Sequence, residues 1–178
     1  MPEGFELPEH DSHEDNPLIM PVSLTVSTMA VLVAAVTLFS HRSHTEELLL
    51  QTQATDQWAY YQAKNGRYHG MKNTVDLLET MVPRDKDSAE AKIKKYEKEI
   101  ERYDSDKDDI SEKANELEKE RDVIGKRADR FDGGEVLIEI GLVICSITLL
   151  TKRRAFWVGG MLIGAIGAAI AATGFFLH

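Results

Sequence analysis

The chain contains few residues whose type and setting suit proton or ion chemistry, and Glu139 stands out among them. It is the one carboxylate within the apolar stretch 136–150. Ionising a carboxylate in hydrocarbon costs several kcal/mol, so such a residue points first to a proton or cation site. The alternative is a neutral or interfacial side chain bonded to a neighbouring span, at Ser27 or Thr28. No second intramembrane charge is present to form a relay, which favours the alternative.

The remaining metal or catalytic candidates have simpler explanations. His10 and His13 lie among carboxylates, but nothing in that tail fixes a ligand geometry, so a solvated tail is expected. The acidic run 104–109 lacks the turn glycine and the bidentate glutamate of a calcium loop, and is expected to be solvated helix surface. Cys145 is expected to be a buried apolar residue. We therefore predict no catalytic residue, metal or cofactor and no enzymatic activity.

A cluster of aromatic and amide side chains is the least generic feature of the polar part. Trp58, Tyr60 and Tyr61 lie close together, with Gln57 and Gln62 beside them. Tryptophan and tyrosine are strong anchors at protein interfaces, so one hypothesis is a face that binds another subunit. The other is packing within the chain, with the polar ends of the rings bonded to a neighbouring helix.

Small residues recur every four positions near the end of the chain, at Gly160, Gly164, Ala168 and Ala172. On a helix this spacing makes a smooth ridge that lets another helix approach closely in a membrane. The ridge is predicted to serve helix packing, either within one chain or between copies.

One long heptad pattern must position these residues. Apolar side chains recur in alternating steps of four and three from Ala89 to Phe131, between residues that are mostly charged. This stripe comprises Ala89, Ile93, Tyr96, Ile100, Tyr103, Lys107, Ile110, Ala114, Leu117, Arg121, Ile124, Ala128 and Phe131. Such a repeat predicts a helix that buries one narrow seam against another helix.

The segment 41–82 is the predicted partner of that helix. Its stripe comprises Gln51, Ala54, Trp58, Tyr61, Asn65, Tyr68, Met71, Val75, Leu78 and Val82. The stripe slips by one residue near Gly66 and Gly70, where a bend or loose turn is expected. A turn near 83–87 would join two arms of nearly equal length, with Asp87 as the N-cap of the second arm. We therefore predict an antiparallel coiled-coil hairpin over 41–131.

Three apolar stretches flank the hairpin and predict membrane spans at 17–40, 132–150 and 155–177. An acidic tail, 1–16, is predicted to be disordered. Asp132, Gly133 and Gly134 are expected to break the seam before the second span. The fold class is thus an all-α membrane protein: three transmembrane helices with an antiparallel coiled-coil hairpin outside the bilayer. The net charge of −9 disfavours a nucleic-acid partner.

The side of the membrane that the hairpin faces depends on two opposing signals. Lys152, Arg153 and Arg154 form a short basic connection, which argues for a cytoplasmic loop and a periplasmic hairpin. Basic residues just before the second span, and none in the tail, argue the reverse. The short loop carries slightly more weight.

The core Asp-Gln-Trp-Ala-Tyr-Tyr-Gln-Ala-Lys, residues 56–64, carries a family resemblance. Together with the preceding apolar helix, the charged helix and two closing apolar helices, it resembles a family of small bacterial membrane proteins known as a domain of unknown function. The likeness runs from about Leu18 to the end. It implies a multi-pass protein of the bacterial inner (cytoplasmic) membrane, and implies no activity.

These patterns favour a structural, self-assembling or accessory role. The expected partners are the lipid bilayer and either further copies of the chain or another membrane protein. The alternative is a small ion or proton transport or channel subunit that uses Glu139.

Overall fold

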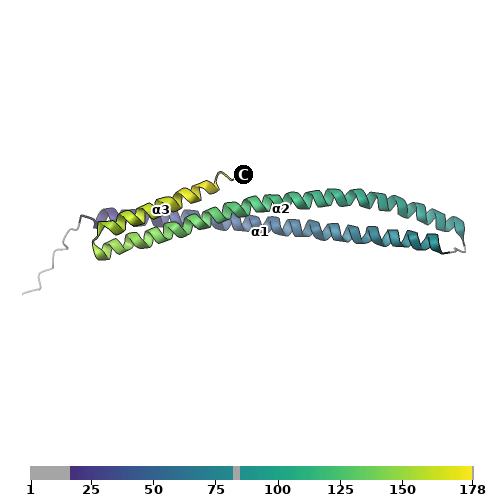
Figure 1. Ribbon diagram of the computed structural model, residues 1–178, viewed down its shortest axis with the longest axis horizontal. Coiled ribbons are helices and arrows are strands. Elements are labelled where there is room, and N and C mark those ends of the chain that lie inside the picture. Colours follow the sequence, from purple (N-terminus) through teal and green to yellow (C-terminus); the bar gives the residue numbers. More distant parts are fainter. Residues whose placement is uncertain (1–16, 82–84, 178) are drawn as a thin grey trace, which may run out of the picture. The chain divides into compact units, whose positions relative to one another are not determined.

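The structure, a computed structural model, describes residues 17–81 and 85–177. These residues form three α-helices: α1, Ile19–Thr80; α2, Lys86–Thr151; and α3, Arg154–Gly174 (Figure 1). The predicted tail 1–16 and residues 82–84 of the predicted turn lie outside the described residues. The expectation of an all-α chain with two long helices packed against each other is confirmed.

The helices contribute to two compact units, divided after Phe39 and before Arg130. The first, which we call the bundle, contains the described residues of 17–39 and residues 130–176. The second, which we call the hairpin, contains the described residues of 40–129 together with Leu177.

In the hairpin, α1 and α2 run antiparallel. The contacts show this directly, because residues later in α1 bond to residues earlier in α2. Gln51 bonds to Arg121, Trp58 to Glu118, and Lys64 to Asp106. The predicted stripe on α2 is buried or half-buried at every position from Ala89 to Ala128. On α1 the same holds from Ala54 to Leu78, whereas Gln51 is exposed.

The loose turn that the sequence offered at Gly66 and Gly70, as the alternative to a bend, does not form, since α1 is one uninterrupted α-helix there. Each glycine costs about 1 kcal/mol of helix propensity relative to alanine. Neighbouring stripe residues Asn65, Tyr68 and Met71 remain at least half-buried. Burial along the seam thus outweighs the local weakness of the helix.

The N-cap of α2 is Asp85, two residues before the predicted Asp87. The Ser88 backbone N–H donates to the Asp85 carboxylate oxygen at 3.2 Å. The Ala89 N–H bonds to the Asp85 carbonyl at 3.3 Å. An acidic N-cap satisfies free amide groups of the first turn and complements the helix dipole.

The predicted break at Asp132–Gly134 is also wrong, since α2 continues without interruption from Lys86 to Thr151. Gly134 is buried, so the glycine admits a close neighbour there and does not end the helix. The helix ends where Lys152 takes a left-handed backbone with φ 56°. Arg153 is extended, and α3 begins at Arg154.

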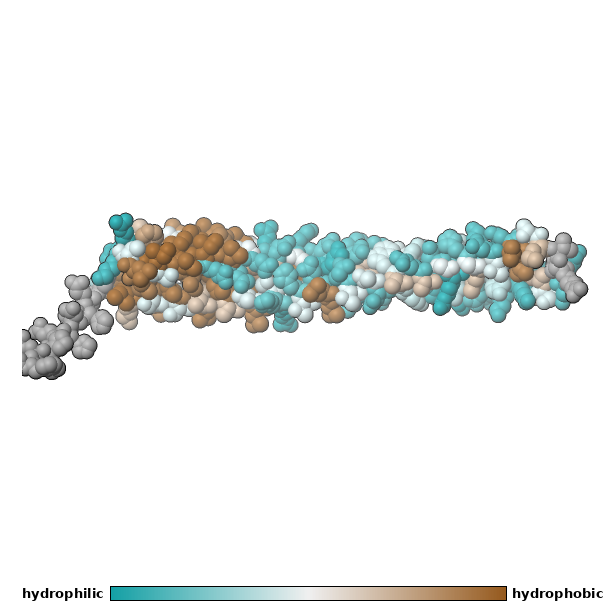
Figure 2. All heavy atoms as spheres, turned by 90° about the horizontal axis from the view of Figure 1, so that it is seen from below, coloured by the Kyte–Doolittle hydropathy of each residue, from teal (hydrophilic) through white to brown (hydrophobic). Residues whose placement is uncertain are grey.

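The bundle carries large apolar side chains on its outer surface, part of which is seen as a brown region in Figure 2. Residues more than half exposed include Leu24, Val31, Leu38, Val136, Val143, Leu162 and Ile166. Each of the three helices contains a segment long and apolar enough to cross a membrane. Length and composition therefore support membrane association.

Candidate functional site

The aromatic cluster of the hairpin faces two ways. Trp58 is half-buried, and its indole N–H donates to the Glu118 carboxylate across the seam at 2.8 Å. Its ring meets Tyr61 edge to face, with centroids 5.6 Å apart. Tyr60 is 50% exposed, and Gln62 also points outward. Trp58 thus joins the arms and Tyr61 packs beside it, while Tyr60 and Gln62 form an outer face.

Lys64 links the aromatic cluster to the opposite arm. Its ammonium lies 2.7 Å from the Asp106 carboxylate, 4.7 Å from the Tyr103 ring centroid and 5.4 Å from that of Tyr60. The hydrogen bond to Asp106 raises the pKa of Lys64, and the nearby Tyr60 acts in the same direction. The ammonium is therefore held charged beside two aromatic faces, where cation–π attraction adds to the ion pair.

Lys107 makes a related contact that the heptad pattern alone did not reveal. It occupies a position on the predicted stripe, where an apolar residue is usual, and its ammonium lies 3.8 Å from the Tyr68 ring centroid. Its side chain also reaches Asp104 at 3.1 Å. Lysine at a seam position with tyrosine on the facing arm is the sequence signal for this contact.

In the bundle, α2 and α3 meet through glycines. A Cβ added to Gly141 would lie 2.6 Å from the Gly160 carbonyl oxygen and 2.8 Å from the Gly164 nitrogen. One added to Gly134 would lie 2.7 Å from the Gly167 carbonyl oxygen. All three distances are too short for a real Cβ atom, so only glycine permits this approach. Sequence reasoning missed Gly134 and Gly141, although their spacing of seven matches that of Gly160 and Gly167.

The predicted ridge on α3 only partly coincides with this contact. Gly160 and Gly164 are buried, Ala168 is half-buried and Ala172 is exposed. The residues buried on α3 are Gly160, Gly164, Gly167, Ala171 and Gly174. Their steps alternate between four and three, as expected for a nearly parallel or antiparallel helix pair.

Cys145 is fully buried, as expected, and its sulfur lies 3.5 Å from the Trp157 carbonyl oxygen. Trp157 is half-buried, and its indole N–H donates to the Thr25 hydroxyl at 3.2 Å. This residue therefore connects α3 to α1 inside the bundle.

Glu139 and Glu135, which lies just before the apolar stretch 136–150, have different surroundings. Glu139 is exposed on the bundle surface, and Thr28 bonds instead to the Leu24 carbonyl at 2.8 Å. Glu135 is half-buried, and its carboxyl lies 2.5 Å from the Thr37 hydroxyl of α1. The carboxylate bonded to a neighbouring apolar segment is thus Glu135, where the sequence suggested Glu139.

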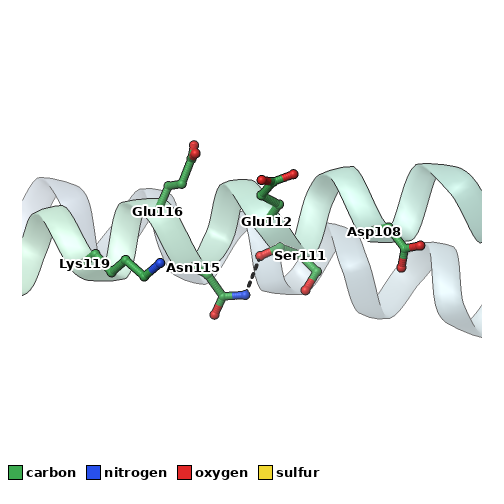
Figure 3. Close-up of a pocket in the computed structure, with 6 residues that line it drawn as sticks. All are labelled: Asp108, Ser111, Glu112, Asn115, Glu116 and Lys119. Atoms are coloured by element: carbon green, nitrogen blue, oxygen red, sulfur yellow. Dashed lines mark hydrogen bonds between the residues drawn. The ribbon is translucent and has the colours of Figure 1, made fainter.

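A polar stretch on α2 forms a shallow surface depression. Figure 3 shows its six lining residues, all from this one helix: Asp108, Ser111, Glu112, Asn115, Glu116 and Lys119. The Asn115 amide donates to the Ser111 carbonyl at 2.8 Å, a local helix contact. Within 17–81 and 85–177, no three His, Cys, Asp or Glu side chains are grouped to hold a metal ion.

Residues 18–177 match the family described as "Domain of unknown function (DUF4337)". No curated protein and no solved structure matches the chain.

Proposed function

The chain belongs to this domain family, and on that premise we propose that it is a membrane-anchored helical hairpin with a structural or accessory interaction role. The bundle would be the membrane anchor and the hairpin the part that recognises a partner. The proposed location is the bacterial inner membrane, with the hairpin on the periplasmic side.

One contrast in surface chemistry carries this proposal. The bundle exposes leucine, valine and isoleucine on all three helices, as a surface in contact with lipid would. The hairpin exposes mainly charged side chains. The aromatic side chain of Tyr60 lies among these charged residues and is half exposed. Its ring lies 5.4 Å from the Lys64 ammonium. An exposed tyrosine on a mostly charged surface supports a protein contact, because tyrosine is a strong interface anchor.

Cross-linking followed by native mass measurement of the full chain in detergent tests this role. We expect a discrete oligomer or a complex of fixed composition. Tyr60→Ala should weaken it about tenfold, the effect typical of losing an interface anchor. Leu77→Ala is the matched control, since Leu77 is similarly exposed on the same helix and should leave assembly unchanged. A monomer at all concentrations, or equal behaviour of both variants, contradicts the proposal.

Transport through Glu139 is the competing function and has its own test. Glu139 lies on the exposed surface of the bundle, so a conduction path would require a second molecule to cover it. Proton flux into proteoliposomes above the protein-free level, abolished by Glu139→Gln, would establish transport. We expect no such flux.

A further inference from the structure

An apolar groove lies on the bundle surface between α1 and α3, with a volume of about 290 Å³. Its floor is formed by buried residues: Met29, Ile138 and Gly164. Its walls are Leu32, which is 43% exposed, and the exposed Ala165. The volume is at the lower end of the range for ligand clefts, so the groove suits a slender apolar chain.

Small residues on α3 keep this groove open. Gly164 leaves room for the Met29 thioether, which a Cβ at this position would strike. Ala165 and Ala168 form a low wall where larger side chains would fill the space. Met29 and Leu32 then present hydrocarbon to whatever occupies the groove.

Residues 152–154, the turn from α2 into the start of α3, are basic and adjoin one end of the groove; we call them the basic turn. Trp157 bonds to the groove residue Thr25, and Arg154 lies three residues before Trp157. From Arg154 to the groove residue Met161 is seven residues, or about 10 Å along the helix. Arg153 and Arg154 are both exposed, and neither forms an ion pair within the described part of the chain.

Within the described helices, the charges near the basic turn are strongly one-sided. α3 contains no aspartate or glutamate, and the first on α1 is Glu46. On α2 the nearest carboxylate is Glu139, thirteen residues before Lys152 and thus about 20 Å away along the helix. Arg153 and Arg154 therefore form a cationic pair beside a hydrocarbon groove, which is complementary to an anionic amphiphile.

We propose that the groove and the basic turn together bind one anionic phospholipid. Its acyl chain would lie between α1 and α3, and its phosphate would accept hydrogen bonds from Arg153 and Arg154, whose planar guanidinium groups suit phosphate oxygens. Trp157 would lie between the groove and the basic turn, at the membrane depth where interfacial aromatic side chains are favoured. This inference rests on the membrane anchoring proposed above.

Tryptophan quenching by brominated lipid tests the site in the full chain. The chain has two tryptophans, so Trp58→Phe leaves Trp157 as the only reporter. The protein is reconstituted in phosphatidylcholine vesicles that contain dibrominated phosphatidylglycerol or dibrominated phosphatidylcholine. We expect phosphatidylglycerol to bind near Trp157 at least about fivefold more strongly, the effect of one engaged basic residue.

Paired variants separate headgroup from acyl-chain recognition. Arg153→Gln with Arg154→Gln should reduce the preference to about one, whereas Lys94→Gln with Lys95→Gln removes the same charge from the hairpin and should retain it. Ala165→Leu fills the groove and should also remove the preference. Ala169→Leu is its control, because Ala169 is exposed on α3 and does not line the groove.

The other outcomes would overturn either the lipid site or the membrane anchoring proposed above. Equal quenching by both lipids, or a preference that survives loss of both arginines, overturns the lipid site and leaves the anchoring proposal intact. If the preference for phosphatidylglycerol appears only after residues 1–16 are removed, the acidic tail is what binds the basic turn in the full chain. That result also overturns the lipid site. Absence of quenching by either lipid overturns the anchoring itself.

Discussion

The bundle and the hairpin both contain parts of α1 and α2, but the helix pairs in the two units are held together by different contacts. In the bundle, α2 and α3 approach until backbone atoms meet, as at Gly141 and Gly160. In the hairpin, long side chains cross the seam, as in the bond from Trp58 to Glu118 and the ion pair of Lys64 with Asp106. The pairing of α2 with α3 depends on the absence of side chains. The pairing of α1 with α2 depends on side chains long enough to bond across the seam.

The difference is consistent with the surroundings proposed for each unit. An apolar exterior suits lipid, where burying another apolar side chain gains little and close packing must hold helices together. A polar exterior suits water, where burying apolar surface stabilises a seam by roughly 25 cal/mol per Å². Charged side chains can join such a seam because their ends remain close to solvent.

The largest expected effect comes from adding one methyl group where backbones meet. Gly141→Ala would place a Cβ 2.6 Å from the Gly160 carbonyl oxygen, and a backbone atom cannot move aside. We expect a loss of about 1–3 kcal/mol of bundle stability, as for overpacked cores. Thermal unfolding of the full chain in detergent, followed by circular dichroism, measures it.

Gly133→Ala is the matched control on the same helix. A Cβ at Gly133 meets nothing within 4 Å, so this variant should gain up to about 1 kcal/mol from helix propensity. The two substitutions are chemically identical and should have opposite signs. Equal effects would mean that the glycine contact does not hold α2 to α3.

A smaller effect is expected for the side-chain contacts of the hairpin. Trp58→Phe removes the indole donor, and Glu118→Gln removes the charge of the acceptor. A double-mutant cycle should give a coupling of about 1 kcal/mol, since the bond is only partly buried. Hydrogen exchange of amides at 54–64 reports on the hairpin, and bundle amides serve as the internal control. Additive single effects would show that the two side chains act independently.

The smallest effect concerns pH. The pKa of Lys64 is raised in the folded chain by its bond to Asp106. Its stabilising contribution should therefore be complete below the unfolded lysine pKa of about 10.4 and be lost as pH rises through the higher folded value. Hydrogen exchange of the hairpin at pH 9 and pH 11 measures this loss. Lys64→Arg should not show this loss, because arginine stays charged at both pH values.

Particular residues show where sequence reasoning reached its limit. The stripe from Ala89 to Ala128 was predictable because burial along a helix follows a period of 3.5 to 3.6 residues. The break at Gly133 and Gly134 was predicted wrongly, because isolated propensity treats glycine as a weak point. In the structure Gly134 has a neighbour, and the packing of α3 against it outweighs the lost propensity.

Candidate site residues were less predictable than helices, again because their contacts depend on how separate helices pack. The cluster at 57–62 was identifiable from its aromatic content, yet its division into a seam side and an outer side required the position of Glu118. Lys64 gave no signal as a contact, since its partners Asp106 and Tyr103 lie about 40 residues away. Glu139 was correctly located in an apolar segment, but its exposure depends on where α1 and α3 pack.

By itself the sequence determined that the chain is helical, where its apolar stretches lie, and which stripe of the charged helix is buried. These properties depend on the order of residues along one helix, at a period that backbone hydrogen bonding sets. Only the tertiary structure decided which glycines meet, which carboxyl bonds to Thr37, and where the groove opens. Those outcomes depend on the distance and rotation between helices, which result from the packing of many side chains together.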